Sequence, residues 1–316
     1  MTLPVDVRPL RITPALCAGD PLARYWLGQA HARLRRELAW AWHERGTAAP
    51  DDQALPAFTD RAGRAVDLVR RWDEKIDFFA TDPAARYLSG CIAEPEPAAP
   101  AAPARGSFAW VAAELGLAPL ERFWLALALS SASDAAVGAV MAACTNDPAR
   151  TRPSLGLAQQ LWDLPAEVGR LCDPALPLHR IGLVVTAAGA HIDWDAPAAV
   201  PPLLVPRLLG EVAPAPASLI EPDTDEIAEG VPLETIVRLL ASAPADRLRV
   251  VAVQALRGDA AGAALALAGH GGRRVLRVRD EIAGAGRDHL DALATWAWLA
   301  DVDLFLPAGA TVAIVG

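Results

Sequence analysis

The sequence predicts an α+β protein that is mostly helical, and three observations support this class. Apolar residues recur three and four positions apart through the first third of the chain. Several short helix patterns precede one apolar strand pattern in the middle third. In the last third, apolar runs of strand length alternate with helical segments. Together these patterns indicate a chain dominated by helices with a few short strands.

The amino-acid composition indicates a folded protein and limits the classes of partner that it can bind. The chain has 316 residues, of which 53% are hydrophobic and 21% charged, so it has ample material for packed cores. Its net charge is −9, from 38 acidic and 29 basic residues, and Lys75 is the only lysine. So acidic a protein is a poor nonspecific partner for nucleic acid or an anionic membrane.

The expected location is the cytoplasm. The first dozen residues have no apolar stretch of a secretory signal, and no run of about 20 apolar residues is present to cross a bilayer. The four cysteines are far apart and form no CxxC pair, which fits a reducing compartment. They are Cys17, Cys91, Cys144 and Cys172.

Two proline-rich segments divide the chain. Residues 94–105 (EPEPAAPAAPAR) are predicted to be a stiff, exposed linker, and residues 213–230 an acidic one. The predicted units are therefore a helical domain over 1–93, a domain over 106–212 and a third unit over 231–316. We expect these units to pack independently.

In the first unit, two apolar stripes at helical spacing each end in an aromatic residue. They are Leu27, Ala30, Leu34, Leu38 and Trp42, and Ala65, Val69, Trp72, Ile76 and Phe79. The favoured interpretation is a helical hairpin whose apolar faces pack together. The alternative is an exposed stripe that docks a partner helix.

In the middle unit, capping residues and prolines mark four short helices. Their expected ranges are 108–115, 118–129, 134–144 and 154–161. The apolar run 179–187 is predicted to be a strand, with 191–194 as its return strand. Helices followed by a small hairpin make the order of a winged helix.

The last unit alternates as a parallel α/β sheet does. Strands are expected at 248–256, 274–278, 302–306 and 311–315. Helices are expected at 262–268 and from Asp288 or Asp291 to about Trp298.

Residues 111–162 and 177–184 resemble the winged-helix region of a family of large bacterial AAA-type ATPases found with extracellular contractile injection systems. The marks are Leu-Gly-Leu at 115–117, Glu121-Arg122 and the stretch 152–157 (RPSLGL). The resemblance spans roughly residues 20–316. It implies a helical N-terminal part, a winged helix and a first AAA-like module.

A P-loop module needs GxxxxGK[ST] between a strand and a helix, because Lys and Ser/Thr hold phosphate and Mg²⁺. Here the turn contains Gly258, Asp259 and Gly262, but Ala263 and Ala264 stand where Lys and Ser/Thr belong. The apolar run 302–306 lacks the acids of a Walker B strand at its carboxyl end, since Asp301 and Asp303 flank its start. We therefore expect a degenerate P-loop, no catalytic residues and no bound ATP.

Other patterns are weaker. His191, Asp193 and Asp195 have a ligand-like spacing, but a solvated hairpin explains them, and no metal site is expected. His270 is interpreted as part of a helix-ending turn. The acids Glu221, Asp223, Asp225, Glu226 and Glu229 lack EF-hand spacing and indicate a solvated linker. Trp296 and Trp298 cannot both face inward on one helix, so one is a candidate interface residue.

DNA binding is disfavoured by charge. Residues 106–211 contain six arginines and ten acids, a balance of −4. In a winged helix, the helix at 154–161 would be the one that reads DNA. It is apolar here, because it carries Leu155, Leu157 and Leu161.

These observations favour a non-catalytic adaptor or assembly protein related to AAA-type ATPases. Its expected partners are proteins, namely components of an injection system or the ATPase that serves one. The alternatives are the N-terminal regulatory part of a longer active ATPase, which the abrupt apolar end of the chain favours, and a winged-helix DNA-binding protein.

Overall fold

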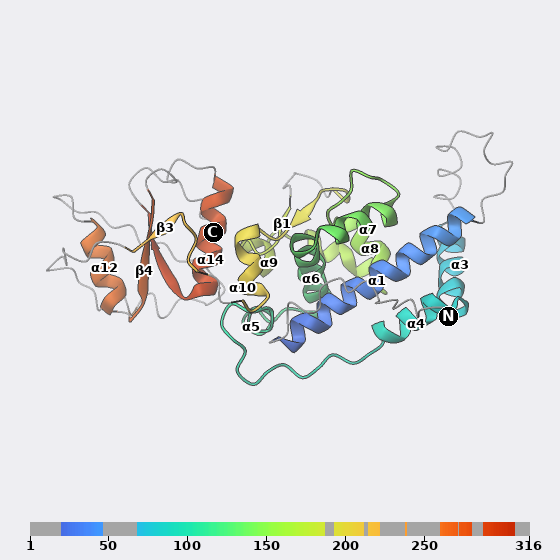
Figure 1. Ribbon diagram of the computed structural model, residues 1–316, viewed down its shortest axis with the longest axis horizontal. Coiled ribbons are helices and arrows are strands. Elements are labelled where there is room, and N and C mark those ends of the chain that lie inside the picture. The colour runs from blue at the N-terminus through green and yellow to red at the C-terminus, as the bar shows by residue number, and fades with distance from the viewer. Residues whose placement is uncertain are drawn as a thin grey trace, which may run out of the picture.

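The part of the chain that the structure describes is mostly helical (62%) with small sheets, which agrees with the mostly helical α+β prediction. The computed structural model describes residues 20–46, 68–186, 193–211, 214–221, 238, 260–270, 272–279 and 287–306. These form a helical body up to residue 211 and a smaller α/β module after it, which lie end to end along the long axis (Figure 1).

The central element of the helical body is α1 (Pro21–Gly46). Asp20 caps its start and also joins it to the middle of the chain, because its carboxylate accepts hydrogen bonds from the N–H groups of Ala23 (2.9 Å) and Ala109 (2.8 Å). Leu27 and Leu34 are buried as predicted. Helix α1 contacts helices from both the first and the second predicted unit. The two units therefore share one core. The expectation that they pack independently is wrong.

The predicted hairpin is a three-helix arrangement. Helix α1 packs against α3 (Leu68–Thr81) and, more extensively, against α4 (Pro83–Ile92), which had not been predicted. Asp82 caps α4 by accepting a hydrogen bond from the N–H of Ala85 (2.8 Å). Trp42 and Ile76 are exposed, so the two apolar stripes do not face each other along their whole length.

The four short helices of the middle unit are confirmed. They are α5 (Phe108–Glu114), α6 (Pro119–Ser133), α7 (Ala135–Thr145) and α8 (Leu155–Leu161). Side chains of Ser107, Asp134 and Ser154 cap α5, α7 and α8, and Glu121 bonds back to the N–H of Ala118 at the start of α6 (2.8 Å). Local capping chemistry therefore fixed these boundaries.

The predicted wing differs from the observed one. The remaining short elements of the body are η3 (Pro165–Cys172), α9 (Pro177–Arg180), β1 (Val185–Thr186), β2 (Ala198–Ala199), η4 (Pro202–Leu204) and α10 (Val205–Leu208). The strand prediction for 179–187 is wrong over 179–184, because Pro177 begins a helical turn there, and it is confirmed at β1. Residue 187 lies outside the described part. The return strand is β2, which pairs antiparallel with β1. Residues 191 and 192 lie outside the described part.

Within the described helices, none alone is long and apolar enough to span a membrane. Helices α6 and α7 are long and apolar enough only when they are taken together, and the chain bends by 118° between them.

The segment 94–105 contains no helix or strand, as predicted for a linker. Its first residues are nevertheless bonded to the body. The Tyr25 hydroxyl donates to the Glu94 carbonyl (3.0 Å), and the Glu96 carboxylate binds the Trp26 indole N–H (3.1 Å) and Arg122 (2.6 Å). Between Glu96 and Ala104 the segment makes no hydrogen bond to the other described residues.

We expect limited proteolysis with a broad-specificity enzyme to cut first between residues 97 and 102, where the backbone is exposed and held by few bonds. Because α1 packs on helices from the other side of the cut, the fragments should elute together from a sizing column. Separation of the fragments under native conditions would contradict the shared core.

The α/β module has a three-stranded sheet in the order β3-β4-β5. Its elements are β3 (Leu219–Ile220), α12 (Ala260–His270), β4 (Arg274–Val278), α14 (Arg287–Ala300) and β5 (Val302–Phe305). Strands β4 and β5 are parallel, with Arg274 opposite Val302, as predicted. Strand β3 pairs antiparallel with β4 and had not been predicted. The strands expected at 248–256 and 311–315 lie outside the described part.

Helix α14 joins the module to the body. Its Thr295 hydroxyl donates to the Ile181 carbonyl, Trp296 is buried beside Arg207, and Trp298 contacts the ring of Trp110 (4.9 Å between centroids). One cluster of buried apolar residues continues from α1 through α14 to β5. Trp296 is therefore buried, whereas Trp298 is half-buried against Trp110, and its role as an interface residue stays a prediction.

Candidate interaction surface and predicted sites

The degenerate P-loop is described only in part. Gly258 and Asp259 lie outside the described residues, whereas Gly262, Ala263 and Ala264 belong to the first turns of α12. Gly262 is buried and Ala264 is half-buried. A hydrogen and two methyl groups cannot hold phosphate or Mg²⁺, so these positions offer no side-chain chemistry.

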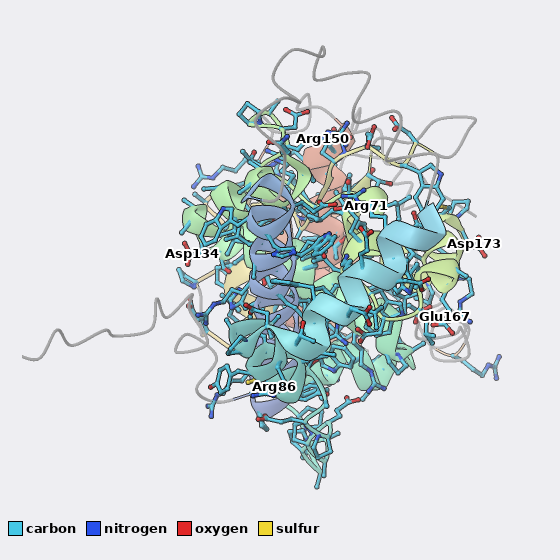
Figure 2. All side chains as sticks on the ribbon, turned by 90° about the vertical axis from the view of Figure 1, so that its right-hand side faces the viewer. Arg71, Arg86, Asp134, Arg150, Glu167 and Asp173 are labelled. Carbon is cyan, nitrogen blue, oxygen red and sulfur yellow. The ribbon has the colours of Figure 1, made fainter. Side chains whose placement is uncertain are left out.

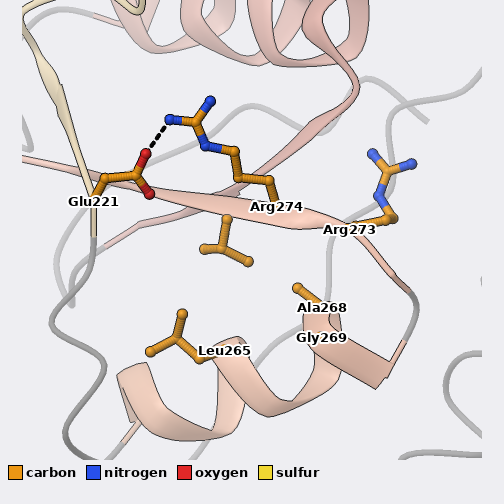
Figure 3. A pocket seen from close by; sticks show the side chains of 7 residues that line it. Glu221, Leu265, Ala268, Gly269, Arg273 and Arg274 are labelled. Carbon is orange, nitrogen blue, oxygen red and sulfur yellow. Dashed lines mark hydrogen bonds and ion pairs between the residues drawn. The ribbon is translucent and has the colours of Figure 1, made fainter.

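A pocket of about 420 Å³ lies between α12 and β4 (Figure 3). Its lining residues are Glu221, Leu265, Ala268, Gly269, Arg273, Arg274 and Val275. The pocket is at the carboxyl end of α12 and the start of β4. A P-loop binds phosphate at the opposite end, where a helix begins and parallel strands finish. The position of this pocket therefore does not correspond to a P-loop nucleotide site.

The charges beside this pocket are already paired. Arg273 binds Asp301 (3.0 Å) and Asp303 (2.8 Å), and Arg274 binds Glu221. Asp301 also forms an ion pair with Arg105, at the end of the linker (3.1 Å). The two acids that flank the candidate Walker B strand thus hold arginines of neighbouring segments.

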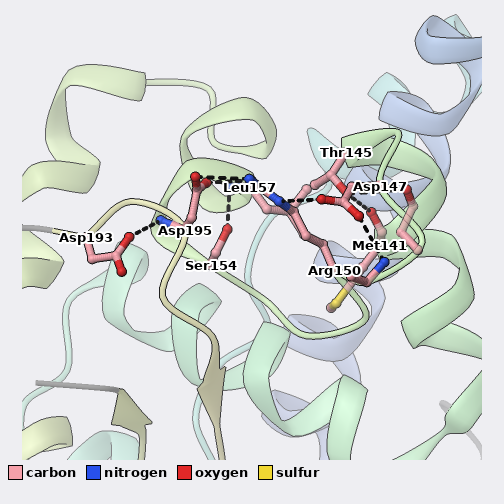
Figure 4. A network of polar contacts seen from close by, with 10 residues as sticks. Met141, Thr145, Asp147, Arg150, Ser154, Leu157, Asp193 and Asp195 are labelled. Carbon is pink, nitrogen blue, oxygen red and sulfur yellow. Dashed lines mark hydrogen bonds and ion pairs between the residues drawn. The ribbon is translucent and has the colours of Figure 1, made fainter.

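The acids of the predicted wing have a similar role (Figure 4). Asp195 binds both amino groups of Arg150 (2.5 and 3.0 Å), and Arg150 also binds Asp147 (3.2 Å). Asp193 accepts a hydrogen bond from the N–H of Asp195 (2.9 Å). His191 lies outside the described residues, among which no cluster of three His, Cys, Asp or Glu is placed to bind a metal.

The two remaining predicted features contribute little. His270 is the last residue of α12. Of the acidic stretch, Glu221 is described and is paired with Arg274, while Asp223, Asp225, Glu226 and Glu229 lie outside the described part.

Sequence reasoning missed a buried ion pair between α1 and α3. The ammonium group of Lys75 lies 2.5 Å from the Glu37 carboxylate, and the two side chains are 8% and 7% exposed. Lys75 also donates to the Gln160 carbonyl at the end of α8 (2.9 Å). Burial raises the pKa of Glu37, and the attraction of Lys75 offsets part of that rise. The only signal in the sequence was that this lysine is unique.

A second ionic cluster lies one turn earlier on α1. Asp163 binds Arg33 (2.6 Å) and Arg36 (2.9 Å), and the Arg33 guanidinium lies over the rings of Phe123 (5.5 Å) and Trp162 (5.1 Å). Burial acts to raise the pKa of Asp163, but the two arginines outweigh it and lower that pKa. These two clusters, which we call the α1 latch, hold α3 and α8 in fixed positions on α1.

Beyond the α1 latch, the body carries large apolar side chains on its surface. Viewed from the α3–α4 end, α3 lies obliquely beside α1 (Figure 2). On the two adjacent helices α1 and α4, Trp42 is 61% exposed and Tyr87 is 72% exposed. Aromatic side chains on rigid, exposed helix faces are typical anchors of protein interfaces. We use the term candidate interaction surface for these two exposed aromatic residues, one on each helix.

Comparison with protein families, with curated proteins and with solved structures finds no match for this chain.

Proposed function

We propose that this chain is a non-catalytic adaptor or assembly protein that binds other proteins through α1 and α4. The observation that carries the proposal is the exposure of Trp42 and Tyr87 on helices whose opposite faces are firmly packed. The resemblance of residues 111–162 to AAA-type ATPases suggests the setting, which is a contractile injection system or its ATPase.

Rigidity supports this role. The α1 latch fixes α3 and α8 on α1, and α14 connects the body to the α/β module through one continuous core. A preorganised surface loses little conformational entropy when a partner binds. A firmly packed helical body suits the joining of two other components.

The DNA-binding alternative has weaker support. In the winged-helix interpretation α8 would be the reading helix, and its Leu155, Leu157 and Leu161 are buried in the core. The surrounding unit also has a balance of −4, which opposes phosphate contact.

Co-expression with the tube, sheath, baseplate and ATPase proteins of a contractile injection system tests the proposal. We expect one of them to purify with the tagged chain. The double variant Trp42→Ala/Tyr87→Ala should weaken that complex at least tenfold, since truncating two aromatic anchors removes about 2–4 kcal/mol of binding free energy.

Trp194→Ala is the matched control, because Trp194 is also exposed but lies in the loop before β2. It should leave the complex unchanged. The proposal is wrong if none of these proteins binds, or if the double variant binds as the wild type does.

A further inference from the structure

A second, smaller pocket of about 130 Å³ lies where the linker ends, beside α10. Its lining residues are Ala104, Arg105, Ser107, Arg207, Gly210 and Glu211. Arg105 and Arg207, which are about 100 positions apart in the chain, therefore line the same cavity.

Arg207 has an unusual environment. Its Nε is buried without a hydrogen-bond partner among the described residues, and no described carboxylate lies within ion-pair distance of it. Burial alone lowers the pKa of Arg207. Four other described arginines also have a buried, unbonded Nε. Arg33 and Arg122 have the carboxylate partners Asp163 and Glu96, and Arg180 and Arg277 make other interactions within the chain. A cation that is partly desolvated without a counter-charge favours an anion beside it.

Both guanidinium groups are held in place by tryptophan rings. Arg207 lies over Trp296 (5.2 Å) and Arg105 over Trp110 (4.8 Å). Arg105 uses one amino group, Nη2, for the Trp298 carbonyl and for Asp301 (both 3.1 Å). Its other nitrogens make no hydrogen bond to the described residues.

Ser107 adds a hydroxyl to the same lining. The side chain is buried, and its oxygen accepts a hydrogen bond from the N–H of Trp110 (3.3 Å). No described residue accepts the hydroxyl proton, which leaves a donor for a ligand.

We propose that this pocket binds a small oxyanion, a phosphate or a carboxylate group, between Arg207 and Arg105 with the Ser107 hydroxyl as a further donor. A planar guanidinium presents parallel N–H donors that match two oxygens of such a group. The volume accommodates one such group and excludes a whole nucleotide. This site is independent of the candidate interaction surface on α1 and α4.

Glu211 is the only acid among the lining residues, and it is exposed. Its negative charge opposes an anion in the pocket. This gives the site two residues whose removal has opposite consequences, which a purely structural role would not produce.

The test compares thermal unfolding in sodium phosphate, sodium acetate and sodium chloride at equal ionic strength. We expect phosphate or acetate to raise the Tm of the wild type by several degrees above its value in chloride, because a ligand that binds only the folded state stabilises it. The anion that acts at lower concentration identifies the preferred group. Calorimetric titration then gives the Kd.

Arg207→Gln should weaken the Kd at least tenfold, whereas Glu211→Gln should tighten it about threefold or more. Arg86→Gln, on the exposed side of α4, should behave as the wild type does. The inference is overturned if neither anion stabilises the wild type more than chloride does, or if Glu211→Gln leaves the Kd unchanged. Glu211 is exposed, so its variant remains informative even where Arg207→Gln folds poorly.

Discussion

Lys75→Met should lower the free energy of unfolding by about 3–5 kcal/mol, because it leaves the Glu37 carboxylate buried without its partner. The methionine keeps the apolar length of the lysine side chain, so packing against Trp72 and Phe79 is largely preserved. Chemical denaturation followed by circular dichroism at neutral pH measures the change.

The double variant Glu37→Leu/Lys75→Met should recover most of the loss, since replacing both members of a buried ion pair by apolar residues is often neutral. The matched control is Arg71→Met. Arg71 binds Glu44 in an exposed pair (2.8 Å), so its loss should cost no more than about 1 kcal/mol. A Lys75→Met protein as stable as the Arg71→Met control would show that the α1 latch does not hold α3.

The pH dependence has a definite sign. Burial raises the pKa of Glu37, so the stability linked to its protonation is fully present below its ordinary pKa of 4.5 and is lost as pH rises through the raised value. Without Lys75 that pKa rises further. The deficit of Lys75→Met should therefore be smallest in acid and grow toward neutral pH.

Gly106→Ala should destabilise the protein by about 2–5 kcal/mol and loosen the attachment of α14. Gly106 has a φ of +81°, which is costly for any residue with a side chain, and an added Cβ would lie 2.7 Å from the Leu299 carbonyl oxygen. In the Gly106→Ala protein, amide hydrogen exchange in α14 should accelerate relative to the wild type, and it should accelerate more in α14 than in α6.

Gly116→Ala separates backbone strain from the clash. Gly116 also has a positive φ, +59°, but nothing lies within 4 Å of its added Cβ. It should cost only about 1–2 kcal/mol and leave exchange in α14 unchanged. Equal effects of the two variants would mean that the close approach of Gly106 to α14 contributes nothing to the joint.

The candidate interaction surface illustrates the limit of sequence patterns. Periodicity placed Trp42 and Ile76 on buried stripes, whereas both are exposed. The pattern finds which residues share a helix face but not how far the neighbouring helix extends along it. The α1 latch and the pocket at Arg207 were equally invisible, because their members are tens of residues apart in the chain.

Helices and strands with local signals could be predicted from the amino-acid sequence. Ser107, Asp134 and Ser154 cap helices within three residues of themselves, and the apolar runs of β4 and β5 are continuous. The central position of α1 in the body and the packing of Trp298 on Trp110 depend on the three-dimensional arrangement and have no local signal. The same arrangement also places the only lysine opposite Glu37. Capping and periodicity depend on neighbours in the chain, whereas burial and charge pairing depend on neighbours in space.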